Sequence, residues 1–167
     1  EFTNDESGVG LTNATAIRAA DMRFTASVGA GLTTDYARAA HDLAARFQAN
    51  HHPTLPHRAA LVLVDALAGH AEEFVNALTV ETAGSYRFFG GGAGDDARFQ
   101  KTFVFCGTQV YADAAVALEI ISKKPLGLGA RHGWKAASSP LRVTEADSSR
   151  VVSLNAAPAI EAFEDHA

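Results

Sequence analysis

The chain has 167 residues, of which 47% are hydrophobic and 20% charged, and its net charge is −5. This length and composition are typical of one soluble globular domain and exclude an intrinsically disordered chain. The acidic balance, without any Lys- or Arg-rich segment, argues against nucleic acid or an anionic membrane as partner, and no apolar run reaches the roughly 18 residues that span a bilayer.

The beginning of the chain predicts a tail, a hairpin and a helix. Residues 1–7 are polar and predict a disordered or appended tail. Small and β-branched residues at 8–17 and 22–30 predict two strands that form a hairpin. Thr34 or Asp35 then caps a helix whose apolar side chains recur at helical spacing.

A buried strand and a second helix follow. Residues 59–64 are continuously apolar, which is typical of a strand covered on both faces. A helix is predicted over residues 70–82, and a short strand over 86–89 leads into a glycine-rich turn. This alternation of strands and helices favours an α/β architecture.

The second half of the chain predicts mainly antiparallel strands. Pro158 suits the first turn of a closing helix that ends near residue 165. The fold class is therefore α/β, or α+β, with a mixed sheet, helices in the N-terminal half and antiparallel strands in the C-terminal half. The strand order does not follow from the sequence. The predicted strands occupy residues 99–105, 109–121, 125–134, 141–145 and 151–154.

Residues 88–96, Phe-Phe-Gly-Gly-Gly-Ala-Gly-Asp-Asp, are the most unusual segment. Glycine contributes no side chain to a core, but it allows positive φ and close approach of the backbone. Backbone N–H groups in such a turn form an anion-binding nest, and the two carboxylates accept from a cation. The segment predicts a site for a zwitterion, with a plain tight turn as the alternative. Its candidate ligand-binding residues are Gly91, Gly92, Gly94, Asp95 and Asp96.

Three further residues are candidates for contact with a ligand. Asp65 ends the buried strand, where ligand sites of α/β sheets gather; the alternative is that it caps the segment that follows. Trp134, the only tryptophan, can wall a pocket with its indole. His132 can contact a ligand or act as an axial haem ligand; alternatively, it holds its loop through a backbone carbonyl.

Motifs for catalysis are weak in this sequence. It contains neither a phosphate-binding loop nor a Gly-x-Ser-x-Gly elbow, and no metal site is predicted. The single cysteine, Cys106, has no flanking base and cannot form an internal disulfide, which fits the reducing cytoplasm. An enzyme therefore stays the alternative to a binding module. Such a small hydrolase would use Asp65, Asp95 and His132.

Several segments, in this order, resemble the N-terminal region of the FIST domain. Residues 64–69 are similar to the strand-end segment of that family, although Ala66 stands where glycine is usual. Residues 143–144 and 151–160 resemble its closing hairpin and helix, so the resemblance covers roughly residues 20–165. The segments that carry most of the resemblance are 90–96, 99–105, 110–114 and 127–134.

The resemblance implies a sensory module of signal-transduction proteins that binds small ligands such as amino acids. Haem and gas sensing occur in some relatives, so a haem-binding gas sensor is a second implied function. Residues 1–167 are then one FIST-like N-terminal domain and a fragment, which stops before the C-terminal FIST region. That region, or a separate signalling output domain, is the implied partner. We expect a cytoplasmic sensor that binds an amino-acid-like ligand at the glycine-rich turn.

Overall fold

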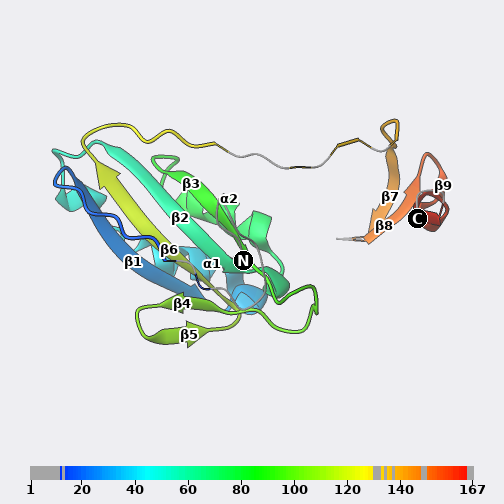
Figure 1. The fold of residues 1–167 in the computed structure, drawn as a ribbon, viewed down its shortest axis with the longest axis horizontal. Coiled ribbons are helices and arrows are strands. Elements are labelled where there is room, and N and C mark those ends of the chain that lie inside the picture. The colour runs from blue at the N-terminus through cyan, green and yellow to red at the C-terminus, as the bar shows by residue number, and fades with distance from the viewer. Residues whose placement is uncertain are drawn as a thin grey trace. The chain divides into compact units, whose positions relative to one another are not determined.

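The computed structural model describes residue 12 and residues 14–129, 133, 135–136, 138–147 and 150–164. The chain divides into two compact units, Glu1–Leu128 and Gly129–Ala167. Figure 1 shows the elements of each unit. Every helix among the described residues is too short or too polar to cross a membrane.

The first unit is built on a four-stranded sheet with the order β1-β6-β2-β3. β2 and β3 run parallel, whereas β6 pairs antiparallel with both β1 and β2. This mixed sheet confirms the predicted fold class and supplies the strand order. The strands are β1 (Met22–Ala30), β2 (His57–Asp65), β3 (Arg87–Ala93) and β6 (Ala114–Ser122).

Two helices cover one face of this sheet (Figure 1). Helix α1 (Leu32–Ala44) follows β1, and helix α2 (Ala71–Glu81) makes the crossover between the parallel strands β2 and β3. Phe74 and Leu78 lie one helical turn apart on α2 and are completely buried. The core between helices and sheet also contains Leu32, Ala39, Ala40, Leu43, Ala60, Val62, Val64, Ala115 and Ala117.

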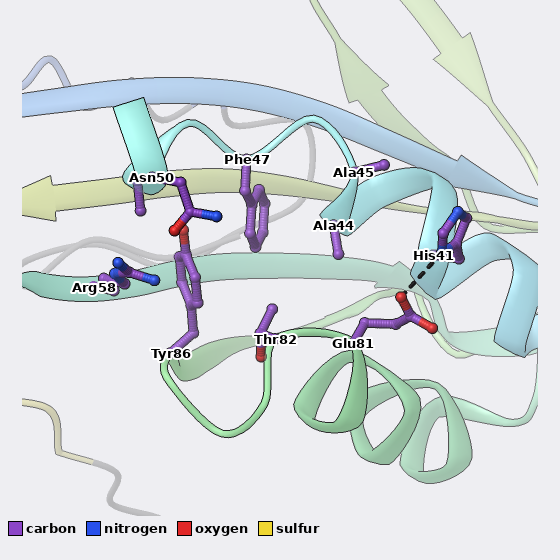
Figure 2. Close-up of a pocket in the computed structure, with 10 residues that line it drawn as sticks. His41, Ala44, Ala45, Phe47, Asn50, Arg58, Glu81, Thr82 and Tyr86 are labelled. Carbon is purple, nitrogen blue, oxygen red and sulfur yellow. Dashed lines mark hydrogen bonds and ion pairs between the residues drawn. The ribbon is translucent and has the colours of Figure 1, made fainter. Parts of the chain in front are cut away.

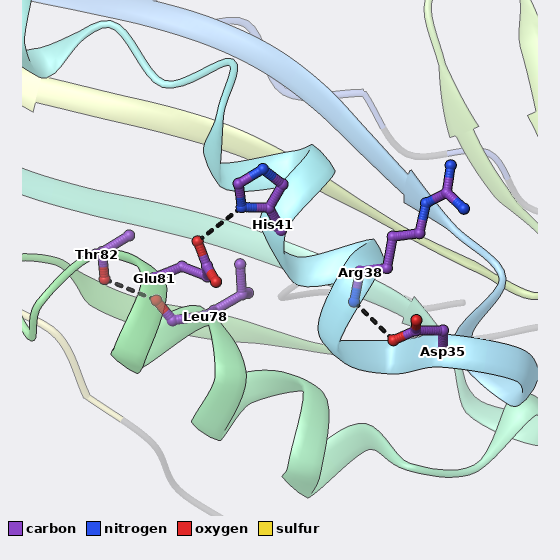
Figure 3. Close-up of polar contacts among 6 residues, drawn as sticks. All are labelled: Asp35, Arg38, His41, Leu78, Glu81 and Thr82. Atoms are coloured by element: carbon purple, nitrogen blue, oxygen red, sulfur yellow. Dashed lines mark hydrogen bonds and ion pairs between the residues drawn. The ribbon is translucent and has the colours of Figure 1, made fainter.

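Helix α1 contains a kink at Asp35, whose φ of −158° and ψ of 83° are not helical. The Asp35 carboxylate accepts a hydrogen bond of 2.9 Å from the N–H of Arg38 (Figure 3). Asp35 therefore caps the longer part of the helix, as predicted. The helix nevertheless begins at Leu32, one turn before this cap. Short 3₁₀ helices at Ala49–His51 and Ala66–Ala68 follow α1 and β2.

The prediction of a glycine-rich turn is wrong, because β3 continues through the three consecutive glycines to Ala93. Gly90 has a φ of 152°, and a Cβ there would lie 1.7 Å from the carbonyl oxygen of Val62 on β2. A Cβ at Gly92 would lie 2.7 Å from that of Ala66. Glycine is needed here for close packing inside the sheet rather than for reversing the chain.

The predicted strands after the glycines are also partly wrong. Strand β4 covers only Val104–Cys106, since Phe99 has a φ of 54° that a strand does not tolerate. The long predicted strand breaks at Asp113, where φ is 51°, into β5 (Gln109–Tyr111) and β6. β4 and β5 form a separate two-stranded hairpin.

Two other predicted pairings differ from the structure. β1 pairs with β6 rather than with a strand before it, and the described residues 14–17 are not in a strand. Residues 125–129 are not in a strand either. The remainder of both predicted segments lies partly outside the described residues. Both predictions relied on residue type alone. The strand that pairs with β1 is β6, which lies about 90 residues later in the chain.

The second unit is a three-stranded antiparallel sheet with the order β7-β8-β9, followed by helix α3. The predicted hairpin and the closing helix after Pro158 are confirmed. Asn155 and Ala156 both have positive φ and form the tight turn between β8 and β9. The elements are β7 (Val143–Asp147), β8 (Arg150–Leu154), β9 (Ala157–Pro158) and α3 (Ala159–Glu164).

Candidate functional site

Asp65, the predicted residue at the end of β2, is 6% exposed. Its carboxylate accepts hydrogen bonds from the N–H of Leu67 at 3.1 Å, from the N–H of Asp113 at 2.7 Å and from the hydroxyl of Thr102. Burial acts to raise the pKa of Asp65, but these hydrogen bonds together outweigh it and lower the pKa. Asp65 therefore caps the segment that follows it, and its contact with a ligand stays a prediction.

Asp113 extends this network to helix α1. Its carboxylate accepts from the N–H of Thr33 at 2.8 Å and from the Thr33 hydroxyl at 2.9 Å. Its carbonyl oxygen accepts from the N–H groups of Gly31 and Leu32. Asp113 thus satisfies the free N–H groups at the start of the helix, which explains why α1 begins before the predicted cap.

Asp95 accepts three backbone N–H groups, from Phe99 at 2.9 Å, Gln100 at 2.6 Å and Lys101 at 3.1 Å. The Gln100 bond is the main cause of the lowered pKa of Asp95, and burial opposes it. Because Lys101 adjoins Thr102, the structure brings Asp95 and Asp65 to the same loop. Asp95 holds the backbone of this loop, whereas Asp65 accepts from the side chain of Thr102. Asp96 is exposed, with a φ of 62°.

The glycine segment borders an apolar cavity rather than a mixed-charge turn. Gly91 and Gly92 lie in β3, and Gly94 follows the strand. The cavity has a volume of about 270 Å³ and no charged side chain in its wall. Its lining consists of Val62, Val64, Ala71, Val75, Phe88, Phe89, Gly90, Gly91 and Gly92.

His132 and Trp134 lie outside the described residues, so their predicted roles stay predictions. Haem needs an apolar cavity with an axial ligand such as His, Cys, Met or Tyr. Within the described residues, the apolar cavity beside the glycines offers none of these ligands. That cavity therefore does not fit haem. The described residues also contain no cluster of three or more His, Cys, Asp or Glu side chains able to hold a metal ion.

A different pocket combines charges of both signs (Figure 2). It has a volume of about 160 Å³ and lies beside the C-terminal ends of α1 and α2. We call it the Arg58–Glu81 pocket, after the charged residues seen at opposite ends in Figure 2. The pocket is lined by His41, Ala44, Ala45, Phe47, Ala49, Asn50, Arg58, Glu81, Thr82 and Tyr86.

At one end of this pocket, the Arg58 guanidinium lies over the ring of Tyr86, 5.9 Å from the ring centre. The Tyr86 ring in turn lies 4.8 Å from that of Phe47. No ion pair and no hydrogen bond of the Arg58 side chain occurs within the described residues. Arg58 thus brings an uncompensated positive charge to a wall of aromatic rings.

At the other end, His41 Nδ1 of α1 lies 3.0 Å from Glu81 Oε2 of α2 (Figures 2 and 3). Next to Glu81, the Thr82 hydroxyl donates to the carbonyl of Leu78 at 2.8 Å and so closes the end of the helix. The His41–Glu81 contact therefore joins the two helices at this end of the pocket.

A buried carboxylate holds the wall of the pocket in place. Glu119 of β6 is completely buried and accepts from the N–H groups of Gln48 at 2.7 Å and Ala49 at 3.0 Å, and from the hydroxyl of Tyr86. Burial, and next the bond to Glu119, raise the pKa of Tyr86. These bonds fix the loop after α1 and the tyrosine ring against the central strand.

The sequence analysis missed the residues of this pocket. One signal was present: Glu119 is the only charged residue in the otherwise apolar strand β6, and a buried charge needs partners. Arg58 gave no such signal, because an arginine at the start of a strand is ordinary. Only the fold places it opposite Glu81.

The family model described as FIST N domain matches residues 1–157. Neither the curated proteins nor the solved structures gave a match.

Proposed function

Because the chain belongs to the FIST N domain family, a sensory domain family of signalling proteins, we propose that it is a cytoplasmic module that binds an amino-acid-like molecule in the Arg58–Glu81 pocket. One observation supports this most directly: the same small pocket contains a carboxylate at one end and, at the other, a guanidinium that has no ion pair among the described residues. A zwitterion has the complementary charges. The single cysteine suits the reducing cytoplasm.

The two charged ends of the pocket suit an amino-acid-like molecule whose carboxylate and ammonium groups are separated by an apolar chain, as the α-carboxylate and the side-chain ammonium of lysine are. The planar guanidinium of Arg58 matches a ligand carboxylate with two parallel hydrogen bonds. Glu81 accepts from the ammonium group, in place of His41. The apolar chain between the two charges then packs against Phe47 and Ala44. The volume of about 160 Å³ lies below the range of drug-sized ligands and favours a small molecule.

The His41–Glu81 contact suggests how binding becomes a signal. A ligand ammonium group that engages Glu81 competes with His41, and the link between α1 and α2 is then lost. A ligand shifts a two-state equilibrium only if its affinity for the two states differs. The exchange of His41 for the ligand as partner of Glu81 provides such a difference in affinity. A signalling output domain or a C-terminal FIST region would respond to the change in the helix pair.

The hydrolase alternative receives no support from the described residues. Asp65 and Asp95 both accept backbone N–H groups, and neither is left as a free base. A general base must reach the proton that it removes. The glycine segment as the ligand site stays a prediction, and the variant Asp95→Ala tests it in the same screen.

The experiment is a thermal-shift screen of the whole chain against the common amino acids. A ligand at 100 times its Kd stabilises the folded state by about 2.7 kcal/mol, which raises the Tm by about 5–10 °C in a chain of this size. We expect Glu81→Gln to abolish the shift. The matched control is Glu72→Gln, the same change in the first turn of α2, which should leave it intact.

Two results would contradict the proposal. The first is a folded protein whose Tm responds to no amino acid. The second is a shift that survives in Glu81→Gln but disappears in Asp95→Ala, which would return the site to the glycine segment.

A further inference from the structure

Basic residues that are scattered along the sequence gather at one end of the four-stranded sheet. Arg23 of β1 and Arg58 of β2 both lie opposite Ile121 of β6, one on each side of that strand. Arg87 begins β3 and lies opposite Ala59. Lys123 follows β6 at the same end. The fold thus creates a basic edge that the sequence does not reveal.

A cavity of about 350 Å³ opens at this edge. We call it the basic cavity, because its lining includes three basic residues and no carboxylate. It shares Arg58 and Tyr86 with the Arg58–Glu81 pocket but extends beyond them. Its lining consists of Pro56, His57, Arg58, Ala59, Gly84, Ser85, Tyr86, Arg87, Pro125 and Leu126.

The register of the strands explains the hollow. Ala59 and Arg87 are direct partners in the parallel pair, so their side chains share one face of the sheet. His57 lies two residues before Ala59 and points to that same face. Ala59, which is 2% exposed, contributes a small side chain to the lining between these two basic residues.

The donors left free in the basic cavity belong to basic side chains. The amide and hydroxyl of Ser85 both donate to the carbonyl of Thr82, and the hydroxyl of Tyr86 donates to Glu119. No ion pair or hydrogen bond of the Arg58 or Arg87 side chain occurs among the described residues. Among the described residues, the lining of the cavity thus carries basic side chains and no carboxylate.

We propose that the basic cavity binds the phosphate group of a small phosphorylated molecule. The fork of Arg87 matches two oxygens of a phosphate, and a donor of His57 on the same face of the sheet remains for another oxygen. Arg58 points to the opposite face of β2 and adds positive charge nearby. A tetrahedral dianion suits donors that approach from several directions better than a planar carboxylate does. A volume of about 350 Å³ leaves room for the organic part of such a molecule beside Pro125 and Leu126.

The experiment is an NMR titration of the whole chain with inorganic phosphate, which follows the backbone amide signals. We expect saturable shifts of the Gly84, Ser85 and Arg87 amides. Arg87→Gln should weaken the affinity at least about 10-fold, since a charge-assisted hydrogen bond is worth at least about one factor of ten. The matched control Arg98→Gln makes the same change in a loop at the other end of the sheet and should leave the affinity unchanged.

The result is independent of the proposed function, because Glu81 does not line the basic cavity. Glu81→Gln should lose the response to amino acids and keep the phosphate titration. Shifts that equal those of sodium chloride at the same ionic strength would overturn the proposal. So would a phosphate affinity unchanged in Arg87→Gln, or citrate that binds at these amides more tightly than phosphate.

Discussion

The two ends of the four-stranded sheet carry opposite charges and use them differently. At the end where β2 finishes, the carboxylates of Asp65, Asp95 and Asp113 each accept backbone N–H groups at distances between 2.6 and 3.1 Å. At the opposite end, Arg58 and Arg87 have no ion pair within the described part of the chain. The acidic end is thus devoted to the fold.

This difference separates charges that build the protein from charges available to a ligand. A carboxylate that completes the hydrogen bonding of a helix start or loop cannot be withdrawn without removing the acceptor of those N–H groups. Removal of a guanidinium that has no partner leaves no other group of the protein unsatisfied. The zwitterion predicted at the glycine segment relied on the acidic end, where Asp65 and Asp95 are engaged. The charges at the basic end are the ones left free.

The largest effect is expected from removal of Asp65. The variant Asp65→Ala leaves the N–H groups of Leu67 and Asp113 and the hydroxyl of Thr102 without their acceptor. We expect the free energy of unfolding to fall by about 4 kcal/mol, measured by urea denaturation. The control is Asp96→Asn, which removes an exposed carboxylate, keeps a residue that tolerates the φ of 62° and should change stability by less than about 0.5 kcal/mol. An equal loss of unfolding free energy in both variants would contradict the distinction between carboxylates that support the fold and charges that do not.

The same residue determines the response of stability to acid. The pKa of Asp65 is lower in the folded than in the unfolded state, where it is about 3.9. Its contribution is therefore fully present above that value and is lost as the pH falls through the folded-state pKa. Asp65→Ala should flatten the acid limb of a plot of unfolding free energy against pH. Some dependence on acid pH should remain in this variant, because the pKa of Asp95 is also lowered in the folded state.

The sequence could predict what depends on local pattern. The strand at 59–64, the helix at 70–82 and the hairpin at 141–154 all carry their own periodicity or turn signal. Asp35 was recognised as a cap because its partner, Arg38, is three residues away. These elements follow from neighbours in the chain.

The remaining features depend on contacts between distant segments. Asp65 was recognised as a strand-end residue, but its partners Thr102 and Asp113 lie 37 and 48 residues away. The glycines were read as a turn because their neighbour across the sheet, Val62, cannot be inferred from the chain. The basic edge was missed for the same reason, since strand register alone assembles it.

A smaller effect is expected from a change at Tyr86. Here, at the basic end of the sheet, a carboxylate again supports the fold by accepting hydrogen bonds. Glu119 is the buried carboxylate there, and it too accepts backbone N–H groups. Tyr86→Phe removes one of its three donors and should lower the free energy of unfolding by about 1.5 kcal/mol. Tyr111→Phe, a control without a hydroxyl bond in the described structure, should stay within about 0.5 kcal/mol.

The titration of Tyr86 gives this prediction a second measurement. Its pKa is higher in the folded state than the value of about 10 in the unfolded chain. Stability is therefore fully present below pH 10 and falls as the pH rises from there towards the folded-state pKa. Tyr86→Phe should remove this part of the alkaline slope. An unchanged slope in the variant would show that Glu119 does not rely on the phenol.

The smallest effect is expected from Arg87→Gln, and its size is the sharpest test of the comparison. If Arg87 has no partner in the fold, its removal leaves the free energy of unfolding within about 0.5 kcal/mol of the original. Loss of repulsion from Arg58 can make the change slightly stabilising at low salt, and 1 M salt should abolish that gain by screening. A loss of 1 kcal/mol or more in urea denaturation would mean that the guanidinium supports the fold. The basic end would then resemble the acidic end, and its charge would not be free for an anion.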